Sequence, residues 1–225
     1  HRSIVKSSNV YYYMLANDMG VNLIHDFMKP LGFGQVTGID IPGETRGVLP
    51  STDWKRRTYK RPEQQRWYAG ETISLGIGQG YNNFTMLQLA SATATVAAGG
   101  VHHTPHLVKA QQDAISLQVQ ELPQPPGQSM GYKPDHVAAV KRGMVGVTLE
   151  GTSRGVFAGA PYLSGGKTGT AQAVSIGQKS RYNAAKLAEH QRDHSLYIAF
   201  APADNPRIAV AAIVENAGFG AAHAA

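Results

Sequence analysis

Cysteine is absent from this 225-residue chain, which excludes a disulfide framework and any metal site built on thiolates. Long hydrophobic runs are lacking as well, since the longest uninterrupted apolar stretch, 208–214, has only the length of a β-strand. Charged residues are few, at 16%, but hydrophobic residues make up 42%, so the composition is typical of a folded globular domain and not of a disordered chain.

The charge balance is mildly basic, with 21 Lys and Arg against 15 Asp and Glu and a net charge of +6. No stripe of basic residues interleaved with aromatic residues is present, so we expect no nucleic-acid partner. The densest basic cluster falls within 55–66 and is typical of a solvated loop, with contact to an acidic polymer or to lipid head groups as the alternative.

Hydrophobic spacing and capping residues predict helices in the first two thirds of the chain and strands in the last third. Helices are predicted over 8–19 (ended by Gly20), 21–31 (weakened by Pro30), 85–98, 134–147 and, briefly, near 184–190; strands over 39–41, 166–174, 195–201 and 207–214; a hairpin over 107–132; and irregular structure over 51–70. Helices combined with an antiparallel sheet indicate an α/β (α+β) fold in one domain over 1–225.

The most informative segment is Lys167–Thr170, which reads Lys-Thr-Gly-Thr and follows two glycines. On one rim of a strand, Lys167 and the hydroxyls of Thr168 and Thr170 can attract a carboxylate, and Gly169 lets a peptide backbone approach closely. An exposed strand lysine without a binding role is the alternative for Lys167.

A second motif, Ser-x-Asn, is formed by Ser7 and Asn9 ahead of the first predicted helix. Taken alone, both residue types are common helix N-caps, and capping would explain them. The occurrence of Ser-x-Asn and Lys-Thr-Gly in one chain, in this order, favours a functional role for both.

Two further motif matches are weaker. Gly76–Gly80 resembles a phosphate-binding loop, but no Gly-Lys-Ser/Thr follows it, so we expect no nucleotide. The histidines of 102–106 are interrupted by Pro105 and lack a nearby carboxylate or cysteine, which favours a loop entering a strand over a metal site.

Two serines match nucleophile motifs. Gly151–Gly155 fits the Gly-x-Ser-x-Gly elbow, with Asp193–His194 following in the order of a hydrolase triad, but a helix precedes this serine where a strand is needed. Ser3–Lys6 fits Ser-x-x-Lys, in which a neutral lysine deprotonates a serine one turn away. A frayed segment leading into the helix cap is the favoured interpretation of Ser3–Lys6.

Together the motifs resemble the transpeptidase domain of class B penicillin-binding proteins, whose superfamily combines Ser-x-x-Lys, a Ser-x-Asn motif and Lys-Thr-Gly. The resemblance extends through most of the chain, over Ser7–Tyr13, Thr37–Glu44, Gly76–Gly80, Gln88–Ala90 and Arg192–His194. The aromatic run after Ser-x-Asn and the stretch 182–194 are most similar to the elongation-specific members, the penicillin-binding proteins 2.

One departure from the family is large. The family's nucleophilic Ser-x-x-Lys lies well upstream of Ser-x-Asn, and Ser3–Lys6 does not match it in place. We therefore expect this chain to be the C-terminal part of the transpeptidase domain, without the nucleophile segment, the N-terminal region and the membrane anchor, and to be inactive alone.

The resemblance implies a role for each matched residue. Ser7 passes a proton to the leaving amine, and Asn9 holds the catalytic lysine and a substrate amide. Lys167 supplies positive potential, the hydroxyls of Thr168 and Thr170 grip the substrate carboxylate, and the backbone N–H of Thr170 forms half of an oxyanion hole. The implied activity is a peptidoglycan D,D-transpeptidase that crosslinks stem peptides through a serine acyl-enzyme during cell-wall elongation, without a cofactor.

The implied partners are a stem peptide ending in D-Ala-D-Ala, β-lactams, a membrane glycosyltransferase and other elongation-complex proteins, at the periplasmic face of the bacterial inner membrane. A D,D-carboxypeptidase or β-lactamase with the same fold, or a non-catalytic penicillin-recognising sensor or scaffold, are the alternatives. A β-lactamase would need an added base such as Glu44, Glu63 or Glu71, none of which lies in a recognisable context.

Overall fold

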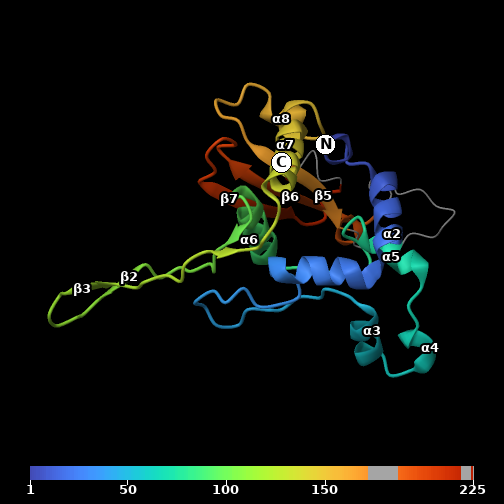
Figure 1. Cartoon of the computed structure of the whole chain (residues 1–225), viewed down its shortest axis with the longest axis horizontal. Coiled ribbons are helices and arrows are strands. Elements are labelled where there is room, and N and C mark those ends of the chain that lie inside the picture. Colours follow the sequence, from blue (N-terminus) through green and yellow to red (C-terminus); the bar gives the residue numbers. More distant parts are fainter. Residues whose placement is uncertain (172–186, 219–223, 225) are drawn as a thin grey trace.

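The computed structural model describes residues 1–171, 187–218 and 224 (Figure 1). Its helices are α1 (Arg2–Val5), α2 (Asn9–Met28), α3 (Thr52–Thr58), α4 (Pro62–Gln65), α5 (Ala69–Leu75), α6 (Met86–Ala97), α7 (Pro134–Leu149) and α8 (Arg154–Phe157), with 3₁₀ turns η1 (Lys29–Leu31) and η3 (Glu189–Gln191). Its strands are β1 (Val101–His102), β2 (Ala110–Gln112), β3 (Val119–Glu121), β4 (Gln128–Ser129), β5 (Gly165–Ala171), β6 (His194–Ala201) and β7 (Ile208–Val214). Within the described ranges no helix has both the length and the apolar character needed to cross a membrane.

The central sheet is antiparallel, as predicted from the three apolar strands of the last third, and its strand order is β5-β6-β7. The register places Lys167 opposite Ile198. Helices α6 and α7 pack against this sheet, and a core of Ala97, Met144 and Phe200 joins them to β6. The prediction of helices with an antiparallel sheet is confirmed, although the end of the first predicted strand, 172–174, lies outside the described residues.

Four helix predictions are confirmed with small shifts in their ends, and they account for three observed helices. The two helices predicted over 8–19 and 21–31 are the halves of α2, which bends at Gly20, where φ is +73°. Glycine adopts this conformation without the steric cost of a side chain. Helix α6 begins with a capping box between Thr85 and Gln88, and α7 begins with Pro134 at its first turn.

The prediction of irregular structure over 51–70 is wrong. Ser51 caps α3 by accepting a hydrogen bond from the Trp54 N–H at 3.0 Å, and α4 follows with Pro62 at its start. Within α3, Lys55 is buried, so the basic cluster is not simply a solvated loop. The basic composition did not distinguish Lys55, whose partners Arg66 and Glu71 lie further along the chain, from its exposed neighbours.

The strand predicted over 39–41 is also absent. The Asp40 carboxylate instead accepts hydrogen bonds from the N–H groups of Leu107 and Val108, at 2.7 and 2.8 Å. These bonds lower the pKa of Asp40 below its usual value. The loop is therefore held by a side chain that caps the backbone of a distant segment, and not by a strand ladder.

The hairpin predicted within 107–132 is present. Strands β2 and β3 pair with Gln111 opposite Gln120, and the hairpin extends away from the body of the molecule (Figure 1). The pair β1 and β4 forms its base. Of the short helix predicted near 184–190, only the part from 187 falls within the described residues, where η3 forms a single turn.

Candidate active site

The two sequence motifs meet at one cavity of about 680 Å³. All six predicted site residues line it: Ser7, Asn9, Lys167, Thr168, Gly169 and Thr170. The junction of α1 with α2 forms one wall, β5 forms a second, and a loop after α5 a third. In Figure 1 the first half of α2 stands beside the sheet edge formed by β5.

Ser7 and Lys167 are in direct contact although they lie 160 positions apart. The Lys167 Nζ donates a hydrogen bond to the Ser7 Oγ at 2.8 Å. Ser7 has a positive φ of +51°, which few residues other than glycine adopt and which marks local backbone strain. The N-cap of α2 is Ser8, so the simple capping explanation is wrong for Ser7, and Asn9 is the first residue of the helix.

The Lys167 ammonium is surrounded by neutral oxygens. Besides Ser7, it donates to the Thr168 carbonyl at 2.7 Å and lies 3.4 Å from the Thr168 Oγ1. The ion pairs of the described residues do not include it. Burial lowers the pKa of Lys167 to about 8, so the group is mostly protonated at neutral pH. Lys167 is partly buried, so the alternative of a plain exposed lysine is wrong, and a cation whose bonds in the described ranges go to neutral oxygens is suited to an anionic ligand.

The remaining residues of β5 are closely packed. The Thr168 Oγ1 lies 2.9 Å from the Thr152 Oγ1, so this hydroxyl already has one partner. A side chain at Gly169 would place its Cβ 3.2 Å from the Leu196 Cβ, which is a tight contact. Among the described strands β5 pairs only with β6, so its other edge can receive a peptide backbone.

Several wall residues were not predicted as part of the site. Gly76, Ile77 and Gln79 line the cavity from the glycine-rich loop that only resembled a phosphate-binding motif. Gly76 is needed there because a Cβ would clash with the Ala16 Cβ and the Tyr12 carbonyl. The Gln79 Nε2 lies 3.5 Å from the Thr170 carbonyl, across the cavity wall. The cluster of glycines at 76–80 was the one sequence feature that could have indicated this wall of the cavity.

Neither alternative nucleophile serine, Ser3 or Ser153, is among the residues that line this cavity. Ser153 is fully buried, and its Oγ donates to the Val147 carbonyl at 3.2 Å and lies 3.0 Å from the Tyr197 Oη. Ser153 therefore cannot reach a substrate. This agrees with the sequence analysis, in which a helix precedes the serine where the Gly-x-Ser-x-Gly elbow needs a strand.

Ser3–Lys6 belongs to an ordered turn and not to a frayed segment, so that interpretation is wrong. Val5 is only 2% exposed, and α1 packs against α7. The Lys6 Nζ donates to the Glu150 carbonyl at 2.9 Å, beyond the end of α7. This bond gives Lys6 a role in joining two helices.

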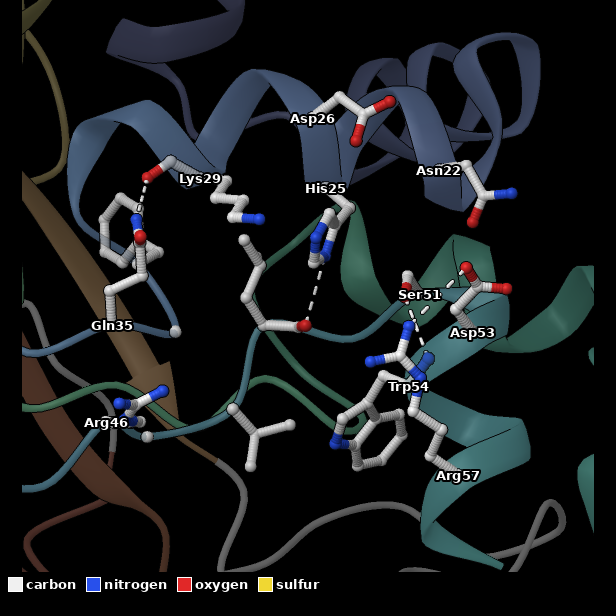
Figure 2. A pocket seen from close by; sticks show the side chains of 15 residues that line it. Asn22, His25, Asp26, Lys29, Gln35, Arg46, Ser51, Asp53, Trp54 and Arg57 are labelled. Carbon is white, nitrogen blue, oxygen red and sulfur yellow. Dashed lines mark hydrogen bonds and ion pairs between the residues drawn. The ribbon is translucent and has the colours of Figure 1, made fainter.

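A larger cavity, of about 750 Å³, lies between the second half of α2 and α3 (Figure 2). None of the six predicted residues lines it. Its His25 Nδ1 lies 3.2 Å from the Leu49 carbonyl, and Asp53 forms ion pairs with both Arg56 and Arg57. Its acidic and basic groups are largely exposed, so size alone does not select it as the functional site.

Comparison with known proteins gives a consistent result. The whole chain, residues 1–225, matches the family described as penicillin binding protein transpeptidase domain. The peptidoglycan D,D-transpeptidase MrdA of Acinetobacter baumannii is 44% identical over 220 residues, which cover 98% of this chain and 32% of that relative. The chain therefore spans about a third of the length of that curated relative.

Two solved structures share the fold. Pseudomonas aeruginosa PBP2 in complex with WCK 5153 is 38% identical with a TM-score of 0.78, over 98% of this chain and 45% of that one. Helicobacter pylori PBP2, solved as a complex with MreC, is 26% identical with a TM-score of 0.79, over 98% of this chain and 37% of that one. The family and fold predicted from the motifs are confirmed.

Proposed function

Because the chain belongs to the family of penicillin-binding protein transpeptidase domains, we propose that it forms part of an elongation-type peptidoglycan D,D-transpeptidase. The reaction crosslinks stem peptides through a serine acyl-enzyme. One observation supports this most directly, namely the hydrogen bond from Lys167 to Ser7 inside a cavity that Asn9 and β5 also line.

The charge of Lys167 serves to bind the terminal carboxylate of the donor peptide. Its pKa of about 8 keeps most of the group protonated at pH 7, and its partners in the described residues are neutral oxygens. The hydroxyls of Thr168 and Thr170 lie on the same strand and line the same cavity. A carboxylate held by one ammonium and by hydroxyl donors gains charge-assisted hydrogen bonds.

Ser7 is arranged to move a proton. An ammonium group can only donate, so the Ser7 Oγ is the acceptor in the bond from Lys167. The hydrogen of the Ser7 hydroxyl is then available to another group in the cavity. In the proposed reaction this group is the leaving amine of the terminal D-Ala, and the Thr170 N–H stabilises the oxyanion that forms at the attacked carbonyl.

The structure favours a transpeptidase over a β-lactamase. Glu71 forms an ion pair with Lys55 and accepts hydrogen bonds from the Tyr81 hydroxyl and the Tyr68 N–H. Glu44 accepts from the N–H groups of Thr37 and Gly38. Two of the three glutamates considered as a water-activating base are therefore engaged in holding the fold.

We place the protein at the periplasmic face of the bacterial inner membrane, in a complex with other elongation proteins. The MreC complex of the Helicobacter pylori relative supports a partner of that kind, and a membrane glycosyltransferase is proposed beside it. The proposed ligands are stem peptides ending in D-Ala-D-Ala and the β-lactams that mimic them.

The nucleophile of this reaction is proposed to lie outside the present sequence. Ser153 is buried, and Ser7 is engaged with Lys167. Incubation of the 225-residue chain with benzylpenicillin should therefore leave its intact mass of 24.1 kDa unchanged. A stable single adduct on this chain would disprove the assignment and make Ser3 the first candidate.

The function itself is tested in a longer protein that carries this sequence after a family Ser-x-x-Lys segment. Benzylpenicillin should form one adduct, and Lys167→Ala should slow acylation about 10- to 100-fold, the equivalent of a lost charge-assisted bond. Lys109→Ala, at an exposed lysine of the hairpin, is the matched control. Unchanged acylation in Lys167→Ala, or a large fall in its thermal midpoint, would contradict the proposed role.

A further inference from the structure

Lys55 is a buried lysine outside the motifs that predicted the site. It is 3% exposed, and the rings of Trp67, Tyr68 and Tyr81 surround its Nζ with centroids at 5.5, 5.4 and 5.5 Å. The Nζ donates to the Arg66 carbonyl at 2.8 Å and pairs with the Glu71 carboxylate. We call Lys55, Trp67, Tyr68, Glu71 and Tyr81 the Lys55 cage. Its cation is satisfied by one anion, one carbonyl and three aromatic faces.

Glu71 connects this cage to a second segment. Its Oε1 accepts a hydrogen bond from the Tyr81 hydroxyl at 2.8 Å, and its Oε2 accepts from the Tyr68 N–H at 2.9 Å. Burial acts to raise the pKa of Glu71, but the bonds from Lys55, Tyr68 and Tyr81 outweigh it and lower the pKa overall. Burial and the neighbouring Glu71 raise the pKa of Tyr81. A neutral phenol thus donates to an ionised carboxylate.

The bond between Glu71 and Tyr81 closes a loop that carries one wall of the candidate active site. Between these residues lie the rest of α5 and then Gly76, Ile77 and Gln79, which line the cavity. Inside the loop, the Gln79 N–H donates to the Ser74 carbonyl at 3.1 Å, and just beyond its end the Asn82 side chain donates to the Leu75 carbonyl at 3.2 Å. A displacement of either end therefore moves the wall as a unit.

The wall has little freedom on its other side. Gly76 packs so closely on α2 that a methyl group would clash with Ala16, and the Gln79 Nε2 lies 3.5 Å from the Thr170 carbonyl. The wall is thus held at two places, by α2 and β5 through Gly76 and Gln79 and by the Lys55 cage at the ends of the loop. None of the cage residues lines the cavity itself.

We propose that Lys55, Glu71 and Tyr81 are positioning residues that set the distance between the Gly76–Gln79 wall and β5, and thereby the affinity of the cavity for its peptide or β-lactam ligand. This inference rests on the proposed function for its ligand. The cage acts through Gly76–Gln79 and touches no reacting atom.

The test uses Tyr81→Phe, which removes one hydroxyl and keeps the ring. Tyr132→Phe is the matched control, because the Tyr132 hydroxyl is buried and has no hydrogen-bond partner within the described part of the chain. In the 225-residue chain, backbone amide resonances of Gly76–Gln79 and Thr170 should shift in Tyr81→Phe and stay in place in Tyr132→Phe.

In the longer acylating protein, Tyr81→Phe should raise the benzylpenicillin concentration that gives half of the maximal acylation rate by about 2- to 10-fold, the equivalent of one net hydrogen bond. The maximal acylation rate should be retained. If the Tyr81 hydroxyl has a purely structural role, the substitution should lower the thermal midpoint and leave the half-maximal benzylpenicillin concentration unchanged. Unmoved resonances with unchanged affinity would overturn the proposal. If the resonances move but the unmutated longer protein forms no adduct, the proposed function fails and the positioning role of the cage remains.

Discussion

The buried Lys55 and the partly buried Lys167 have opposite surroundings. Lys55 is enclosed by three aromatic rings and paired with Glu71, so its charge is neutralised within the fold. The Lys167 ammonium donates its hydrogen bonds in the described ranges to neutral oxygens, those of the Ser7 hydroxyl and the Thr168 carbonyl. Burial lowers the pKa of Lys167 to about 8. Removing one partner of a buried ion pair strongly destabilises a fold, whereas a partly buried cation whose printed partners are neutral oxygens can accept an anionic ligand.

The two cavities show the same difference. The cavity of Figure 2 is the larger, but Asp53 there already pairs with Arg56 and Arg57, and its charged side chains are largely solvated. The smaller cavity is lined by the partly buried Lys167, by the buried Asp193 and by β5, which is at the edge of the sheet among the described strands. The hydrogen-bond and charge partners of the lining residues, more than volume, select this cavity as the candidate site.

The largest expected effect is the loss of the Lys55 charge. Lys55→Met leaves Glu71 without its cation in a mostly buried site, so the free energy of unfolding should fall by about 3–5 kcal/mol. Urea denaturation measures this, with Lys167→Met as the comparison, which should change stability little or increase it. Equal losses in both variants would remove the distinction drawn between the two lysines.

A smaller effect is expected from pH. The pKa of Lys167 falls from 10.5 to about 8 on folding, so between these values the unfolded chain binds more protons and stability rises with pH. The penalty of burying the charge is fully present below about pH 8 and disappears towards pH 10.5, an effect on the order of 3 kcal/mol.

Urea denaturation of wild type and Lys167→Met across pH 7–10 isolates this contribution, because every other group titrates in both proteins. As pH rises, the free energy of unfolding of the wild type should increase relative to that of Lys167→Met. A difference independent of pH would show that Lys167 is solvated and titrates normally.

Ligand affinity should depend on the same titration in the opposite direction. As pH rises through about 8, Lys167 loses the charge that holds the ligand carboxylate, so affinity should fall by up to about tenfold for each further pH step of one. The concentration dependence of acylation in the longer protein, measured at pH 7, 8 and 9, tests this. Affinity that stays constant over this range would exclude Lys167 as the carboxylate partner.

The smallest expected effect is at the strand surface. Gly169→Ala places a Cβ 3.2 Å from the Leu196 Cβ, which should cost about 1 kcal/mol and hinder the approach of a peptide backbone to β5. Gly155→Ala is the control, since a Cβ there meets nothing within 4 Å and α8 should tolerate it. Equal thermal midpoints for both variants would mean that β5 accommodates the methyl group.

Local patterns predicted the long helices α2, α6 and α7 and the three strands of the central sheet, because spacing, caps and glycines act over a few residues. They failed where a distant partner decides the outcome. Asp40 lies in a loop because its carboxylate binds Leu107 and Val108, 67 and 68 positions away. Lys55 is buried because the Arg66 carbonyl and the Glu71 carboxylate bind its ammonium, and the basic composition of 55–66 does not reveal these contacts.

The candidate site divides in the same way. The residue types and their order, Ser-x-Asn and then Lys-Thr-Gly, are determined by the sequence alone, because the chemistry of a carboxylate site requires a cation, hydroxyls and an open backbone. The contact of Ser7 with Lys167, the lowered pKa of that lysine and the Gly76–Gln79 wall were decided only by tertiary structure. The burial of Lys167 and its bond to Ser7 depend on segments 160 positions apart that folding brings together, and no local sequence pattern predicts that contact.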